Sequence, residues 1–146
     1  MEGTKIENEN QTEKSKKGKK GRAKGKRFEL DVRRDLEEKG WVIVKWTNQI
    51  DFEKDKLVPA KSKFNPFLGR VMSSGTGWPD YLGYKRLNFK NGIELIGIES
   101  KYGKYLDAEE KRRALWLLNK RIFDKILIAY KKERGKIDYE EFAEKK

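Results

Sequence analysis

The sequence predicts an α/β domain in which helices pack against a mixed β-sheet, in the order α-β-β-β-α-β. Four runs rich in β-branched and aromatic residues are typical of strands, and two amphipathic segments are typical of helices. An Asn-Gly pair between the second and third runs predicts an antiparallel hairpin. The fourth run follows the second helix and can pair in parallel, which would make the sheet mixed.

The N-terminal segment is strongly basic. The chain carries a formal net charge of +12, and ten Lys or Arg against four Glu in residues 1–27 supply half of it. Residues 1–22 lack apolar periodicity, so we expect a disordered tail before one domain at residues 23–146. Interleaved Gly and Lys favour an arm that seeks nucleic-acid phosphates over a tail that serves only solubility. The residues expected to make these contacts are Lys19, Lys20, Arg22, Lys24, Lys26 and Arg27.

The composition excludes several kinds of chemistry. The 146-residue chain contains no histidine and no cysteine, which rules out Ser-His-Asp and Cys-His catalysis, disulfides and ordinary structural zinc sites. Catalysis is then expected from carboxylates, lysine, hydroxyls or an oxygen-ligated hard metal. Because the chain shows neither an apolar leader nor an apolar run long enough for a bilayer, we expect a soluble, cytoplasmic protein.

The first two elements have clear patterns. Phe28, Val32 and Leu36 recur at four-residue steps, which predicts a helix over residues 23–39. The run Trp-Val-Ile-Val-Lys-Trp at residues 41–46 is rich in β-formers and predicts the first strand.

The segment at residues 47–78 has the weakest pattern. An Asn-Pro pair predicts a short helix that ends at Met72. Basic and aromatic residues interleave before it, which fits either a DNA-contacting flap that includes Arg70 or local packing. Residues 73–77 are expected to form a flexible loop, in which Ser74 is a candidate phosphate contact.

The second and third strands are expected at residues 79–86 and 93–101. Side chains alternate along a strand, so Glu99 and Lys101 should project from the same face. With a six-residue connecting loop, Asp80 lies opposite Glu99 in the antiparallel pair. A tight two-residue turn would instead separate the two carboxylates. A convergent pair therefore requires the wider loop.

The remaining elements are a helix, a strand and a short terminal helix. Asp107 is expected to cap a helix at residues 108–121, with Glu110 as the capping-box residue rather than an active-site residue. A strand is expected at residues 125–131 and a short helix at residues 138–144.

Asp80, Glu99 and Lys101 form the candidate catalytic core. Two adjacent carboxylates repel each other unless a cation lies between them, and Mg²⁺ is a hard ion that prefers oxygen ligands. A nearby lysine can orient or deprotonate an attacking water, or stabilise charge on a phosphate. The structural alternatives are a turn residue at Asp80 and a surface ion pair between Glu99 and Lys101.

These residues carry a resemblance to a known group of enzymes. Pro79-Asp80, followed after eighteen residues by Glu99-Ser100-Lys101, resembles the signature of the PD-(D/E)XK nuclease superfamily. Within it the chain is most similar to the archaeal Holliday-junction resolvases. Glu29, Leu36 and Gly40-Trp41 stand at the spacing of their first helix and strand, and the Ser-Ser-Gly run before Asp80 is similar to their Ser-Gly element.

The resemblance implies a restriction-endonuclease-like core over about residues 25–130. It implies that Asp80, Glu99 and Glu29 bind Mg²⁺, for which Mn²⁺ would substitute, and that Lys101 assists DNA hydrolysis. It also implies branched DNA as substrate and a homodimer, because two symmetric nicks need two active sites. The long insertion at residues 47–72 and the longer gap between Asp80 and Glu99 depart from the family pattern. Three hypotheses follow: a structure-selective endonuclease, a repair or restriction-type nuclease of a mobile element, and a non-catalytic basic DNA-binding module.

Overall fold

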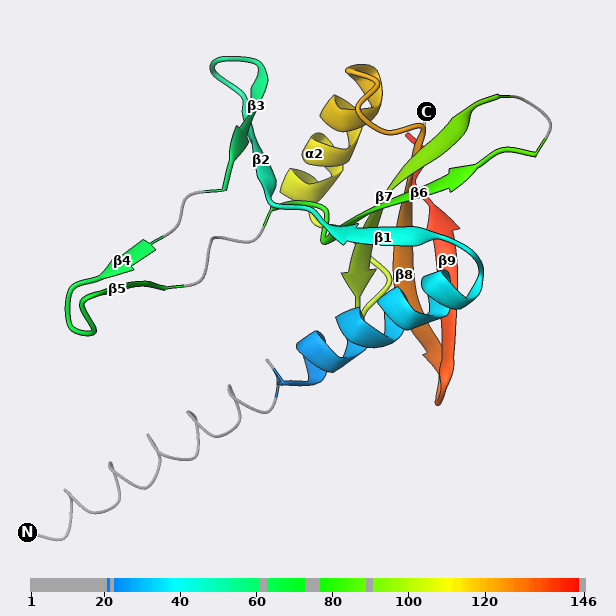
Figure 1. Cartoon of the computed structure of the whole chain (residues 1–146), viewed down its shortest axis with the longest axis horizontal. Helices are drawn as coiled ribbons and strands as arrows, with labels where there is room; N and C mark the ends of the chain where they lie inside the picture. Colours follow the sequence, from blue (N-terminus) through cyan, green and yellow to red (C-terminus); the bar gives the residue numbers. More distant parts are fainter. Residues whose placement is uncertain (1–20, 22, 61–62, 73–76, 89–90, 145–146) are drawn as a thin grey trace, which may run out of the picture.

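A five-stranded sheet forms the centre of the molecule (Figure 1). The computed structural model describes residue 21 and residues 23–60, 63–72, 77–88 and 91–144. The expected disordered tail therefore lies almost entirely outside the described residues. The sheet has the order β1-β6-β7-β8-β9. Its strands are β1 (Val42–Lys45), β6 (Tyr81–Arg86), β7 (Ile93–Lys101), β8 (Lys125–Glu133) and β9 (Lys136–Glu141).

The sheet is mixed, as the sequence predicts. β6 pairs antiparallel with both β1 and β7, and β8 pairs antiparallel with β9. β7 and β8 are parallel, because α2 (Ala108–Asn119) connects them and returns the chain to the same end of the sheet. The order of the elements up to β8 in this sheet matches the predicted order.

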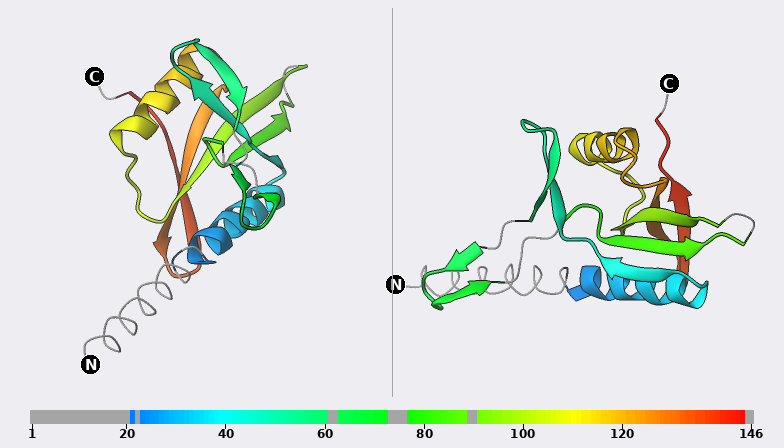
Figure 2. Two further views of the ribbon diagram at one scale, coloured as in Figure 1. Left: turned by 90° about the vertical axis from the view of Figure 1, so that its left-hand side faces the viewer. Right: turned by 45° about the horizontal axis from the view of Figure 1, so that its top comes forward.

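The two helices cover opposite faces of the sheet (Figure 2). The N-terminal helix, residues 23–38, buries Phe28, Val32 and Leu36 against Ile96 and Ile98 of β7. On the other face, Ala114 and Leu117 of α2 pack against three buried residues that follow. These are Phe123 in the turn after the helix, and Ile126 and Ile128 of β8. Alternation along β7 thus divides the core into two layers. None of the helices in the described ranges is long and apolar enough to cross a membrane.

The register of the β6–β7 hairpin confirms the wider loop. Arg86 pairs with Ile93 and Tyr81 with Ile98, and the Leu87 amide donates to the Gly92 carbonyl at 3.0 Å. The same register continued by one residue brings Asp80 opposite Glu99. The condition for a convergent carboxylate pair is therefore met.

The prediction of a short helix that ends at Met72 is wrong. Residues there form a two-stranded ribbon of β4 (Lys63–Asn65) and β5 (Arg70–Met72), and Gly69 adopts a left-handed φ of 59° in the turn between them. A helix of about seven residues would have to nucleate without a long apolar face, which is unfavourable. The Asn-Pro pair begins a turn just as readily as a helix.

The prediction of a terminal helix at residues 138–144 is also wrong. The segment forms β9, which turns back from β8 at Gly135 with a φ of 84°. Ile137 and Tyr139 alternate along it and pack against the core cluster of the N-terminal helix. Pairing with the free edge of β8 satisfies the backbone groups of β9, and no local pattern could reveal that edge.

A second hairpin, absent from the predictions, lies beside α2. It consists of β2 (Asn48–Asp51) and β3 (Lys56–Pro59), and we refer to residues 48–59 as the β2–β3 hairpin. At its tip the Asp55 carboxylate accepts a 2.8 Å hydrogen bond from Trp116 Nε1 and pairs with the Lys120 ammonium. The Arg112 guanidinium lies 3.9 Å from the centre of the Phe52 ring. These contacts fasten the hairpin to α2.

Candidate functional site

Asp80 stands at the entrance of β6, where packing holds the backbone in place. The preceding Pro79 is fully buried and packs closely on Gly97 of β7, where an added Cβ would lie 3.0 Å from the Pro79 Cγ. The Asp80 carboxylate accepts a hydrogen bond of 2.9 Å from the Ser100 amide. Burial raises the pKa of Asp80 above its usual value, although this hydrogen bond opposes the rise.

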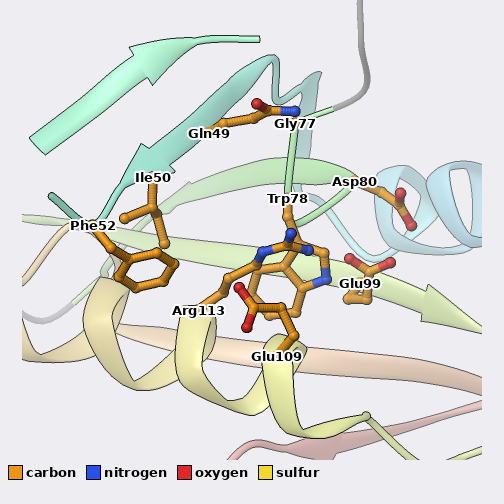
Figure 3. Close-up of a pocket in the computed structure, with 9 residues that line it drawn as sticks. All are labelled: Gln49, Ile50, Phe52, Gly77, Trp78, Asp80, Glu99, Glu109 and Arg113. Carbon is orange, nitrogen blue, oxygen red and sulfur yellow. The ribbon is translucent and has the colours of Figure 1, made fainter.

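Glu99 faces Asp80 across the end of the sheet (Figure 3). Only 7% of the residue is exposed, and its Oε2 is a buried atom without a hydrogen-bond partner among the described residues. Burial raises the pKa of Glu99 to about 10, and the charges of Asp80 and Glu110 add to the rise. Without a cation, Glu99 therefore holds its proton at neutral pH.

Lys101 projects from the same face of β7 as Glu99, as alternation predicts. Its ammonium lies 2.7 Å from Oε2 of Glu110, at the start of α2. Burial opposes the charge of Lys101, but the hydrogen bond and the charge of Glu110 outweigh it and raise the pKa of Lys101. Lys101 is therefore a fixed cation beside the carboxylate pair.

Glu110 has two roles, of which the sequence predicted one. It completes the capping box: its amide donates to Asp107 Oδ1 at 2.8 Å, and its own Oε1 accepts from the Asp107 amide at 3.3 Å. Its other oxygen, Oε2, binds Lys101 and accepts a 3.2 Å hydrogen bond from Trp78 Nε1. A capping box is visible in sequence, but the approach of α2 to the end of β7 is not.

Replacing Glu110 by alanine should destabilise the protein by about 2–3 kcal/mol, since it removes a cap and leaves a buried indole N–H and a lysine without their acceptor. Urea denaturation of the variant measures this loss. Glu109→Ala is the matched control, because Glu109 is exposed in the same turn and its loss should cost under about 0.5 kcal/mol. Equal destabilisation by the two substitutions would contradict the central position of Glu110.

Glu29 lies close enough to the pair to interact electrostatically. Burial raises the pKa of Glu29, and the charge of Asp80 raises it further. Burial, followed by the charges of Glu29 and Asp80, raises the pKa of Tyr81 to about 12. Nevertheless, within the described part of the chain no three acidic side chains are arranged as a ready metal site. The expected metal ligands therefore divide into a facing pair, Asp80 and Glu99, and a more distant Glu29.

The carboxylate pair lies at one side of a pocket of about 300 Å³ (Figure 3). Ile50 and Phe52 of the β2–β3 hairpin and Trp78 supply its apolar lining. Arg113 of α2 also lines it, and is the only basic residue to do so among the residues that the structure describes. Arg113 is not predictable from the sequence, because nothing in a helix rich in Arg and Lys distinguishes the residue that lines the pocket.

The predicted DNA-binding residues are only partly described. Lys24, Lys26 and Arg27 are exposed on the N-terminal helix, the helix that also carries Glu29. Arg70 lies in β5, but its side chain falls outside the described part of the structure. The other predicted contacts lie outside the described residues: Lys19, Lys20, Arg22 and Ser74.

No family model, curated protein or solved structure matches this chain. The structure alone shows the α/β architecture, in which two helices flank a mixed five-stranded sheet. The resemblance to the PD-(D/E)XK nucleases remains a prediction that rests on the spacing of the site residues.

Proposed function

We propose that this protein is a Mg²⁺-dependent endonuclease that hydrolyses phosphodiester bonds in DNA. The observation that carries the proposal is the convergence of the Asp80 and Glu99 carboxyl groups beside a fixed Lys101 at the side of a pocket. A buried acidic pair is costly, and proteins rarely maintain one without a chemical use. The signature spacing of these three residues supports the same conclusion.

The carboxylate pair has the properties of a divalent-cation site. Glu99 Oε2 is buried and unpartnered among the described residues, and Asp80 keeps an oxygen beyond the one bound by the Ser100 amide. The ligand atoms would be hard carboxylate oxygens, which suit Mg²⁺, and waters would complete its coordination. When bound, the ion would polarise the phosphate and acidify an attacking water. Glu29, which interacts electrostatically with Asp80, is the candidate to hold one of those waters.

Lys101 acts as a cation in this proposal rather than as a base. Its pKa is raised, so its ammonium keeps its proton at neutral pH and cannot accept one from water. Glu110 holds the ammonium in place, and a preorganised positive charge stabilises the negative charge that develops on the phosphate. Of the roles open to the lysine from sequence, the raised pKa opposes deprotonation of the water and is compatible with charge stabilisation.

The decisive experiment compares labelled DNA substrates. The purified protein is incubated with a four-way junction, the matching duplex and a single strand, each with and without Mg²⁺. Paired symmetric nicks in the junction support a resolvase-like activity and the homodimer that it requires. Cuts in linear substrates support a repair or restriction-type nuclease. Binding without any cut would refute the nuclease and leave a basic DNA-binding module.

Backbone binding by the N-terminal helix should make affinity salt-dependent. Replacing Lys24, Lys26 and Arg27 with alanine should reduce the slope of log K against log salt by about 2–3, because each phosphate contact contributes about 0.9. Fluorescence anisotropy over a salt series measures the slope. The control variant loses the same charge elsewhere, at exposed Arg86, Arg121 and Lys136. Equal slopes for the two variants would mean that the N-terminal helix has no special contact with DNA.

A further inference from the structure

The pocket beside the carboxylate pair has two chemically different parts. Asp80 and Glu99 form an acidic end, and Glu109 of α2 is a third acidic residue of the lining, whereas Ile50, Phe52 and Trp78 form an apolar and aromatic wall (Figure 3). A site that only bound a cation and a phosphate would have no use for that wall. The apolar part therefore indicates a second group of the substrate, one with a flat hydrophobic surface.

Arg113 lies in the same space and is available for a ligand. Within the described ranges no ion pair involves Arg113, although its neighbour Arg112 pairs with Glu109 at 3.9 Å. Its guanidinium offers several donors in one plane, a geometry that suits a phosphate oxygen or the polar edge of a base. The pocket thus combines an aromatic wall with a free cation, as nucleotide-binding sites do.

The size and enclosure of the pocket limit what can enter. Its volume of about 300 Å³ lies at the lower end of the range for small-molecule sites. The β2–β3 hairpin that forms one side is fastened to α2 through Asp55 and Phe52, so the space exists without a ligand. A base stacked inside an uninterrupted duplex cannot reach the aromatic wall. It must first leave the stack.

We propose that this pocket receives one unstacked base of the DNA strand that is cut, while the neighbouring phosphate lies at Asp80 and Glu99. The inference rests on the proposed function and names its substrate class. The preferred DNA carries an unpaired or easily unpaired nucleotide at the cleavage position, as branched and bulged DNA do. Stacking on the half-buried Phe52 ring, with the edge of the largely buried Trp78 beside it, offsets the cost of extruding the base.

Anisotropy measurements in EDTA test base binding without cleavage. Three labelled DNAs are compared: a duplex with one bulged nucleotide, the same duplex with an abasic residue in the bulge, and the fully paired duplex. The two bulged DNAs have the same charge and differ only in the base. Wild-type protein should bind the base-bearing bulge roughly tenfold more tightly than the abasic one, the effect of one stacked base.

Variants locate the base within the protein. Phe52→Ala should reduce the preference to less than about threefold, whereas Phe52→Tyr, which keeps an aromatic ring against Arg112, should retain it. Tyr105→Ala is the control, because Tyr105 is an aromatic residue that is 86% exposed and does not line the pocket. A preference that survives in Phe52→Ala would put the base elsewhere and overturn the inference.

The failure of this inference and the failure of the nuclease proposal give different results. Equal affinity of the wild type for the base-bearing and abasic bulges overturns the inference, even if Mg²⁺-dependent cleavage is observed. A clear base preference without cleavage of any substrate in Mg²⁺ refutes the nuclease and leaves the base-binding pocket standing.

Discussion

Asp80→Asn should abolish DNA cleavage and leave DNA affinity largely intact. The substitution removes one negative charge from the facing pair, and several kcal/mol of transition-state stabilisation should be lost with the cation, a rate decrease on the order of 10³-fold. The asparagine oxygen can still accept the hydrogen bond from the Ser100 amide, so the end of β6 should keep its position. Single-turnover cleavage of the best substrate, with a parallel anisotropy titration, measures both quantities.

The matched control for this variant is Asp31→Asn, which makes the same chemical change at an exposed position of the N-terminal helix. It should cleave at the wild-type rate. Both variants gain one unit of positive charge, so any general electrostatic gain in DNA affinity should be similar in the two. Retained cleavage by Asp80→Asn would refute the assignment of the site.

The second large effect is on the pH dependence of stability. Glu99 has a pKa of about 10 in the folded protein against 4.5 for the free side chain, so between these values the folded state keeps a proton that the unfolded state has lost. Stability that is fully present below pH 4.5 is therefore lost as pH rises toward 10. The slope of the decrease corresponds to the one proton that Glu99 binds in the folded state and loses on unfolding.

Glu99→Gln removes this titration, so its thermal midpoint should fall less between pH 5 and pH 9 than that of the wild type. Thermal unfolding followed by circular dichroism at several pH values measures the difference. Glu38→Gln, an exposed substitution on the N-terminal helix, should behave as the wild type does. Identical pH slopes for wild type and Glu99→Gln would mean that Glu99 is already ionised in the folded protein.

The same variant tests cation binding without any DNA. Mg²⁺ binding requires Glu99 to lose its proton, so the ion should raise the thermal midpoint of the wild type more at pH 8 than at pH 6. The Glu99→Gln variant should show little stabilisation at either pH. Stabilisation that is independent of Glu99 would locate the ion at another site.

Most elements of the fold, and the Asp80–Glu99 pair, were predictable because short sequence patterns within single elements indicate them. Four-residue steps on the N-terminal helix, alternation along β7 and the capping box of α2 each report on a single element. The register of β6 and β7 followed from one assumption about the length of their loop, and that assumption brought Asp80 opposite Glu99. Two antiparallel strands joined by a single loop can pair in only a few registers.

The elements that the sequence did not predict depend on contacts between distant segments. β9 forms because β8 offers an edge, and the β2–β3 hairpin is held by Trp116 and Lys120 of a helix more than sixty positions away. The proximity of Glu110 to Lys101 and the orientation of Arg113 into the pocket likewise depend on where α2 lies across the sheet. The pattern of residues within one segment does not determine such placements.

The close fit of Pro79 against Gly97 has a consequence for the energetics of ligand capture. Because packing and the Ser100 amide already fix the Asp80 main chain and carboxylate, an arriving ion does not have to order them. Little conformational entropy is then lost on binding, and more of the intrinsic attraction is retained as affinity.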